Sequence, residues 1–232
     1  CMKLLLASPA IDINQAKNDG ATPLLFAAPF GHVESVKRLP ASPSINVNQA
    51  TNTGATPLFM AAQKGQAECV TLLLASPSIA VNQAMNDGRT PLFIAAMKGQ
   101  AECVTLLLTS PSIDANQAKN DGTTPLIVAC ASRSTAAALT LLADERTELD
   151  TKNSNGESAL SCASEGDNAQ LVAALIARGA DPLAAFPNPR VADCVLGRAL
   201  EARARLEGQP QAADDALPEL TRLCLVGTSA QV

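Results

Sequence analysis

Histidine and cysteine are the residue types whose number and spacing bear most directly on catalysis and metal binding in this sequence: histidine is present once, as His32, and cysteine seven times. Zinc sites, serine triads and thiol–imidazole pairs usually need histidine, which argues against all three. The cysteines are odd in number, stand roughly 30 residues apart from Cys69 onward and form no Cys-x-x-Cys pair, which favours reduced thiols. They are Cys1, Cys69, Cys103, Cys130, Cys162, Cys194 and Cys224. We therefore expect no catalytic residue, no cofactor, no metal ion, and an intracellular protein, cytoplasmic or nuclear.

The composition argues against nucleic-acid binding and membrane insertion. Of the 232 residues, 17 are Lys or Arg and 22 are Asp or Glu, so the net charge is −5, the wrong sign for neutralising phosphates. Aromatic residues make up 2%, with no Trp and no Tyr, so the chain has few side chains on which nucleic-acid bases could stack. No apolar run reaches the ~18 residues of a membrane-spanning helix. Hydrophobic residues make up 47%, and most of them are Leu, Ala, Val and Ile, a composition that favours helices.

An internal repeat organises the chain. Five glycines lie 34 residues apart, and each begins a unit: Gly20, Gly54, Gly88, Gly122 and Gly156. The first four are followed by x-Thr-Pro-Leu, and the fifth by x-Ser-Ala-Leu. Residues 56–88 and 90–122 differ at 6 of 33 positions, which leaves 27 identical. Such identity indicates a duplicated structural unit.

The sequence of each unit predicts two helices and a loop, as the unit that begins at Gly88 illustrates. Thr90 is suited to cap a helix over 91–98, with proline at its first position, and Gly99 is suited to end that helix. A second, antiparallel helix over 101–108 carries an apolar stripe of Cys103, Val104, Leu107 and Leu108. The turn-forming residues 110–122 then predict a projecting loop or hairpin. Two short helices cannot bury their apolar faces alone, so the units must stack.

These features resemble the ankyrin repeat: the Thr-Pro-Leu start, an Ala-Ala pair, glycine before the second helix and a Leu-Leu-Leu run. The resemblance implies an all-α solenoid of stacked antiparallel helix pairs with projecting loops. It covers residues 1–187, as a half-repeat over 1–19 and units starting near 20, 54, 88, 122 and 156. Residues 188–207 then predict a C-terminal capping helix, and 208–232 a linker, a short helix and a disordered tail. Because the chain opens inside a repeat, we expect a fragment of a longer protein.

Two departures from the ankyrin pattern bear on stability. The histidine of the usual Thr-Pro-Leu-His motif is replaced by Leu25, Phe59, Phe93, Ile127 and Ser161, which removes a hydrogen-bonding partner. In the first complete unit, Pro29 is expected inside the first helix and Pro40 is expected to truncate the second. An interior proline costs on the order of 3 kcal/mol. We therefore predict that residues 1–53 unfold first.

The resemblance also implies a binding surface, here called the concave face: the finger loops together with the exposed side of the first helices. Centred on the second and third complete units, it predicts the protein-binding residues Asn52, Thr53, Lys64, Asn86, Asp87, Arg89, Met97, Lys98, Asn120 and Asp121. Their basic and apolar members favour an acidic or amphipathic partner segment. The competing interpretation is that Asn-Asp-Gly only forms turns and that the lysines are merely solvated.

Other distinctive residues are assigned to structure. His32 stands at the start of a predicted second helix, where we expect a packing or capping role. Cys69 and Cys103 recur with the repeat and are expected in the core. One loop asparagine per unit is suited to bond neighbouring turn backbone: Asn14, Asn48, Asn82 and Asn116.

The function predicted from these features is a non-catalytic protein–protein interaction module, monomeric, with a protein as partner. Two alternatives stay open at this point. The repeats could recruit substrate for an enzyme such as a kinase or ubiquitin ligase in a longer chain. The near-identical central units would also suit a structural spacer.

Overall fold

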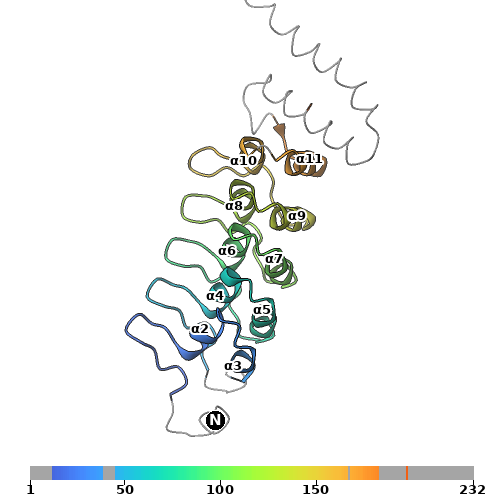
Figure 1. Cartoon of the computed structure of the whole chain (residues 1–232). Coiled ribbons are helices and arrows are strands. Elements are labelled where there is room, and N and C mark those ends of the chain that lie inside the picture. The colour runs from blue at the N-terminus through green and yellow to red at the C-terminus, as the bar shows by residue number, and fades with distance from the viewer. Residues whose placement is uncertain (1–11, 39–44, 167, 183–196, 198–232) are drawn as a thin grey trace, which may run out of the picture.

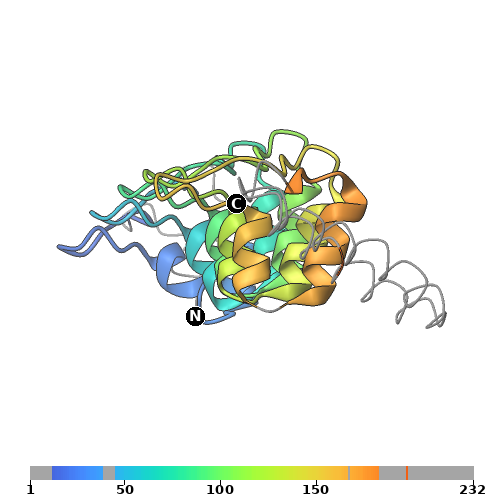
Figure 2. The same ribbon diagram turned by 90° about the horizontal axis from the view of Figure 1, so that it is seen from above.

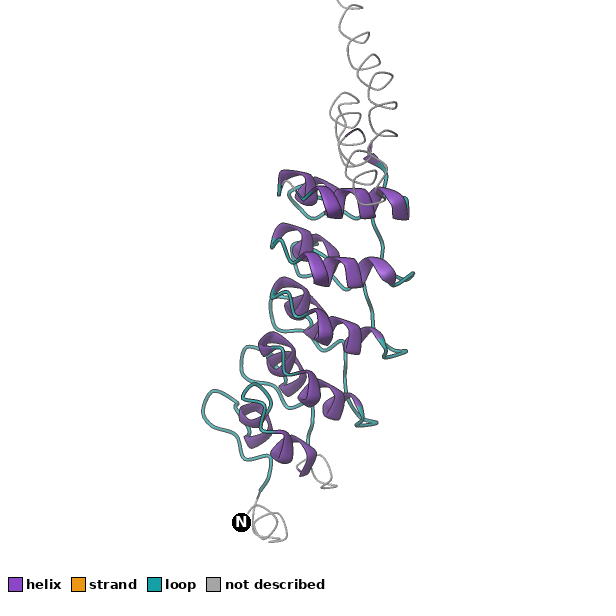
Figure 3. Cartoon of the chain, turned by 45° about the vertical axis from the view of Figure 1, so that its right-hand side comes forward, coloured by secondary structure: helices purple, strands orange, loops and turns teal. Residues whose placement is uncertain are grey.

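The architecture is a stack of helix pairs, seen in a computed structural model that describes residues 12–38, 45–166, 168–182 and 197. Within these residues all regular secondary structure is α-helical, and each pair packs on the next to form two columns (Figure 1). The inner column comprises α2 (Pro23–Ala27), α4 (Pro57–Lys64), α6 (Pro91–Met97), α8 (Pro125–Ala131) and α10 (Ala159–Glu165). The outer column comprises α3 (Val33–Arg38), α5 (Ala67–Leu74), α7 (Ala101–Leu108), α9 (Thr135–Ala143) and α11 (Ala169–Arg178). The pairs form successive layers (Figure 3), which confirms the predicted all-α solenoid.

Every inner helix begins at a buried hydroxyl residue, as the sequence predicts. The side chains of Thr22, Thr56, Thr90, Thr124 and Ser158 each accept a hydrogen bond from the third helical amide, at 3.1 to 3.3 Å. The side chain at that third position, where histidine is replaced, is buried in all five units. A buried side chain thus occupies the position of the missing histidine, and the helix cap still forms.

In the first four complete units, a residue in the left-handed conformation turns the chain from the inner to the outer helix. In the first three complete units it is a glycine, with φ of 66° at Gly31, 70° at Gly65 and 69° at Gly99. A Cβ atom at Gly65 would lie 2.3 Å from Oε1 of Gln100 in the next unit, so any larger residue there would also displace the Gln100 side chain. The fourth unit has Arg133 at this position, with φ of 56°. The helix before Gly99 ends at Met97, one residue earlier than predicted.

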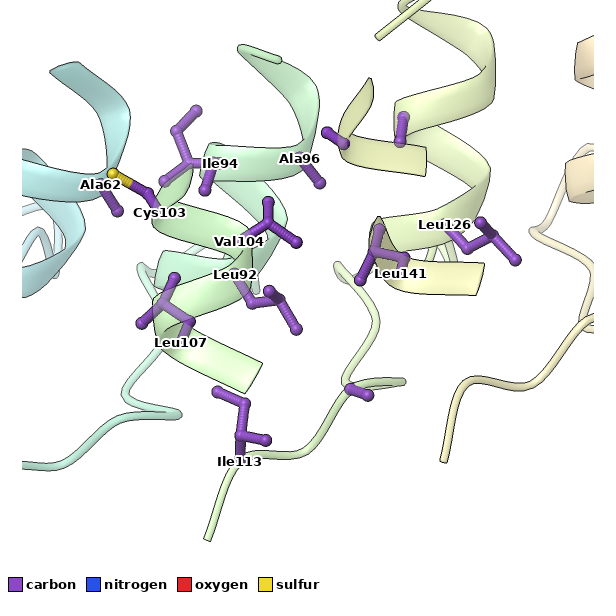
Figure 4. Packing of buried hydrophobic residues seen from close by; sticks show 14 of the residues in the cluster. Ala62, Leu92, Ile94, Ala96, Cys103, Val104, Leu107, Ile113, Leu126 and Leu141 are labelled. Carbon is purple, nitrogen blue, oxygen red and sulfur yellow. The ribbon is translucent and has the colours of Figure 1, made fainter. Parts of the chain in front are cut away.

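The core runs continuously through the stack because each helix buries one stripe against its own unit and its neighbours. In α7, Cys103, Val104 and Leu107 are at most 1% exposed, whereas Leu108, expected on the same stripe, is only partly buried. Buried alanine pairs in the inner helices leave room for close approach between layers. Figure 4 shows side chains of this cluster filling the space between helices of successive units.

The prediction that Pro29 lies inside the first helix of its unit is wrong. Helix α2 has only five residues and its last residue is Ala27, so Pro29 follows the helix rather than interrupting it. Proline cannot continue a helix at low cost, and ending the helix early avoids that cost. Pro40 lies outside the described residues, as do the predicted half-repeat up to residue 11 and, apart from Gly197, the region predicted as capping helix and tail.

The finger loops connect each outer helix to the next inner helix and project on one side of the stack (Figure 2). They are turns and loops within the described residues, not strand hairpins. Each turns at its unit's first glycine, and Gly88 has a φ of 89°. A Cβ atom on Gly88 would lie 2.5 Å from Oδ1 of Asn120, so the glycine lets the next finger pack closely.

Candidate functional site

The tips of the fingers are joined to one another by hydrogen bonds. Backbone amides of Asn52, Asn86, Asn120 and Ser154 each donate to a carbonyl of the preceding finger, at 2.8 to 3.1 Å. The side-chain amides of the same three asparagines donate to the preceding finger as well, at 3.0 to 3.1 Å. Asn52, Asn86 and Asn120 are among the predicted binding residues, and their Nδ2 groups hold the fingers together.

The bases of the fingers are joined by a second row of asparagines. Nδ2 of Asn48 donates to the Ser78 carbonyl at 2.7 Å, and Oδ1 accepts from the Ala80 amide at 2.9 Å. Asn82 and Asn116 repeat both bonds one and two units later, and Oδ1 of Asn14 accepts from the Asn46 amide. The prediction that these asparagines bond turn backbone is confirmed. The structure adds that the backbone belongs to the next unit.

Basic residues on two fingers are paired with aspartates of their own finger. Nε of Arg89 lies 2.6 Å from Oδ2 of Asp87, and Nζ of Lys119 lies 2.6 Å from Oδ2 of Asp121. The Lys119 ammonium, helped by hydrogen bonds from Thr123, lowers the pKa of the Asp121 carboxyl to about 2. Arg89 was expected to be a basic anchor for a partner, but its charge is already compensated by Asp87.

A hollow of about 420 Å³ opens on the concave face, between helices α6 and α8 and three successive fingers. Its apolar floor consists of Phe93, Met97, Ile127, Val128 and Ala131. Its polar rim consists of Asp87, Arg89, Lys119, Thr123, Asn153 and Glu157.

Three of the ten predicted binding residues line this hollow: Asp87, Arg89 and Met97. Lys64 and Lys98 are exposed at the ends of inner helices and do not line it, and Thr53 lies at a finger tip further along the stack. Lys119 and Asn153 line the hollow but are not among the predicted binding residues. Asn153 bridges two fingers by donating to Thr123 at 3.3 Å and to Glu157 at 2.6 Å. The hollow lies one unit beyond the predicted centre of the site, since it is built by the third, fourth and fifth complete units.

The described cysteines and His32 do not line this hollow. Burial raises the pKa of the Cys103 and Cys162 thiols to about 11 and that of Cys130 to about 12, so these thiols stay protonated near neutral pH. The prediction that Cys69 and Cys103 belong to the core is confirmed. His32 is exposed and precedes α3, where its carbonyl accepts the Val36 amide at 3.0 Å. Among the described residues, no group of three or more His, Cys, Asp or Glu could hold a metal ion.

Residues 1–186 of the 232 match a known protein family. The family model described as "Ankyrin repeats (3 copies)" matches in four overlapping stretches, residues 1–83, 41–119, 75–153 and 111–186. No curated protein matches the chain. None of the described helices is long and apolar enough to cross a membrane. The repeated caps, the stacked helix pairs and the family match agree, and the chain belongs to the ankyrin repeat family, whose repeats are generally protein–protein interaction modules.

Proposed function

We propose that this chain is a non-catalytic binding module that holds a protein partner on its concave face. Ankyrin repeats generally mediate protein–protein interactions. The observation that carries the proposal is the hollow between α6, α8 and three fingers, because it combines an apolar floor with polar side chains. Its volume of about 420 Å³ is large enough to receive side chains of another protein.

The rigidity of the fingers supports the same proposal. Two rows of asparagine side chains and one row of backbone hydrogen bonds connect successive fingers. A surface that is already ordered loses little conformational entropy when a partner binds. The rim of the hollow is therefore prepared for binding before the partner arrives.

The proposal is tested by changing the concave face without changing the fold. In the double variant Met97→Gln and Ala131→Glu, each new residue copies the one at the equivalent position of another unit, Gln63 and Glu165. A matched control, Thr71→Glu with Thr105→Glu, places the same kind of charge on exposed residues of the outer helices.

Proteins captured on the full chain are then compared among the wild type and both variants, after circular dichroism has shown equal helix content. We expect the concave-face variant to lose a partner that the outer-helix control retains. Cross-links from that partner should reach Lys98 or Lys119. A partner that is retained by the concave-face variant and lost by the outer-helix control would place binding on the opposite side and contradict the proposal.

A further inference from the structure

The rim of the hollow is formed partly by one repeat position whose charge changes from unit to unit. The residue after each finger glycine is Arg89 in the third complete unit, Thr123 in the fourth and Glu157 in the fifth. All three line the hollow, although they are far apart in sequence. A partner that reaches across the hollow therefore meets a positive, a neutral and a negative residue in turn.

The positive charges of the rim are compensated within the chain. Arg89 is paired with Asp87 and Lys119 with Asp121, both at 2.6 Å. An acidic partner would have to compete with these aspartates for the two cations. The rim therefore gives little net attraction for a carboxylate, in contrast to the acidic segment expected from the residue types alone.

The negative charge of Glu157 is not compensated in this way. Its Oε2 accepts a hydrogen bond from Nδ2 of Asn153 at 2.6 Å, and this amide is neutral. Among the described residues, the ion pairs involve Glu34, Asp87, Asp121 and Asp144, and Glu157 forms none. The side chain is partly buried at the rim, where screening by water is weaker than on an open surface. Glu157 thus offers a fixed carboxylate for a cation supplied from outside.

An apolar contact lies beside this carboxylate. Met97 and Val128 are partly buried and Ala131 is exposed, and all three line the floor of the hollow. Apolar surface left open to water in a hollow favours an apolar side chain of a partner.

We infer that the hollow binds a protein segment in which a Lys or Arg side chain pairs with Glu157 while a neighbouring aliphatic or Met side chain covers Met97, Val128 and Ala131. This inference rests on the proposed function and specifies the chemistry of the partner. The fit is one of charge complementarity: the rim's cations are already paired, and the carboxylate of Glu157 is left for the partner.

The experiment uses a phage-displayed library of random short peptides selected on the full chain. Enriched peptides are then synthesised, and their affinities are measured by fluorescence anisotropy. We expect a basic residue next to an aliphatic residue in the enriched sequences. Glu157→Gln should weaken binding about fivefold, near the upper end for a part-exposed ion pair, and added salt should weaken it further. The matched control Glu145→Gln, at an exposed carboxylate outside the hollow, should leave affinity unchanged.

A second pair of variants tests the apolar contact. Ala131→Leu fills the floor of the hollow and should weaken the same peptides, while Gln63→Leu makes the same kind of change at the equivalent position outside the hollow and should not. The inference is overturned if enriched peptides are acidic and depend on Arg89, if Glu157→Gln has no effect, or if no enriched peptide depends on the hollow. Peptides that respond to Ala131→Leu and not to Glu157→Gln leave the proposed function standing. Peptides whose binding is lost only in the Thr71→Glu, Thr105→Glu control would contradict both the inference and the proposed function.

Discussion

The first and third complete helix pairs follow the same sequence repeat, but they bury their apolar side chains to different extents. Helix α2 has five residues, whereas its equivalent α6 has seven. Phe26 of α2 is 41% exposed, whereas Ile94, at the equivalent position of α6, is fully buried. Both pairs keep the threonine cap and a fully buried leucine behind it.

The sequence signature of the repeat and the stability of a unit are therefore separate properties. The cap and the first leucine are enough to start the inner helix. The amount of apolar surface that the unit buries depends on helix length and on neighbours in both directions.

The largest effect is expected from truncating the same leucine in both units. Leu92→Ala should lower the free energy of unfolding by about 2–5 kcal/mol, because Leu92 lies in a unit packed on both sides and its removal leaves a cavity. Leu24→Ala removes an equally buried side chain from the first complete unit and should shift the main transition by less than about 1 kcal/mol, because that unit opens separately. Urea denaturation followed by circular dichroism measures both. Equal shifts would show that the stack unfolds as one unit.

The next effect concerns local opening of the native stack. The free energy of the opening that exposes the α3 amides to exchange should be about 2 kcal/mol lower than that for α5, because α3 packs on α2, which has only five residues and leaves Phe26 41% exposed. Native-state hydrogen exchange measured by mass spectrometry resolves the two helices. If α3 is protected as well as residues 69–74, the assignment of the first complete unit as the weakest is wrong.

A smaller effect is expected where the fourth unit departs from the first three. Arg133→Gly should raise the free energy of unfolding by about 1 kcal/mol, because a left-handed φ of 56° is unfavourable for a residue with a Cβ atom. Arg133→Ala keeps the Cβ atom and serves as the control, with no such gain. Thermal denaturation of the two variants separates backbone strain from loss of the arginine side chain. An equal change in both would rule out strain as the cause.

The smallest effect is expected from the partly exposed ion pair of the fourth finger, Lys119 with Asp121. The Asp121 carboxyl has a pKa of about 2 in the folded chain, below the ~3.9 of an unfolded aspartate. Its contribution to stability is therefore present above about pH 4 and is lost as the pH falls toward 2. Lys119→Gln should raise the pKa toward the ordinary value, and carbon-detected NMR titration of Asp121 reports it. An unchanged pKa in Lys119→Gln would assign the shift to the Thr123 hydrogen bond instead.

Much of the fold was predictable because its signals are local. The bounds of α7 agree with the prediction of residues 101–108, and the threonine caps form as expected. Such features depend on residues within one helical turn. The candidate site was less predictable, because the hollow joins residues such as Arg89, Thr123 and Glu157 from three different units. Its position depends on how the units stack and on which side chains pair across the fingers.

Two fingers with the same local sequence show this division. Residues 16–20 and 118–122 both read Ala-Lys-Asn-Asp-Gly, which by itself determines the turn and the left-handed glycine in each. Yet Nζ of Lys17 lies over the Phe26 ring, 4.3 Å from its centroid, whereas Nζ of Lys119 lies 2.6 Å from Asp121. At the position equivalent to Phe26, the fourth complete unit has Val128, which offers no π face to the cation. The turn is set by residues next to one another, and the partner of the lysine is decided by the helix that folds against it.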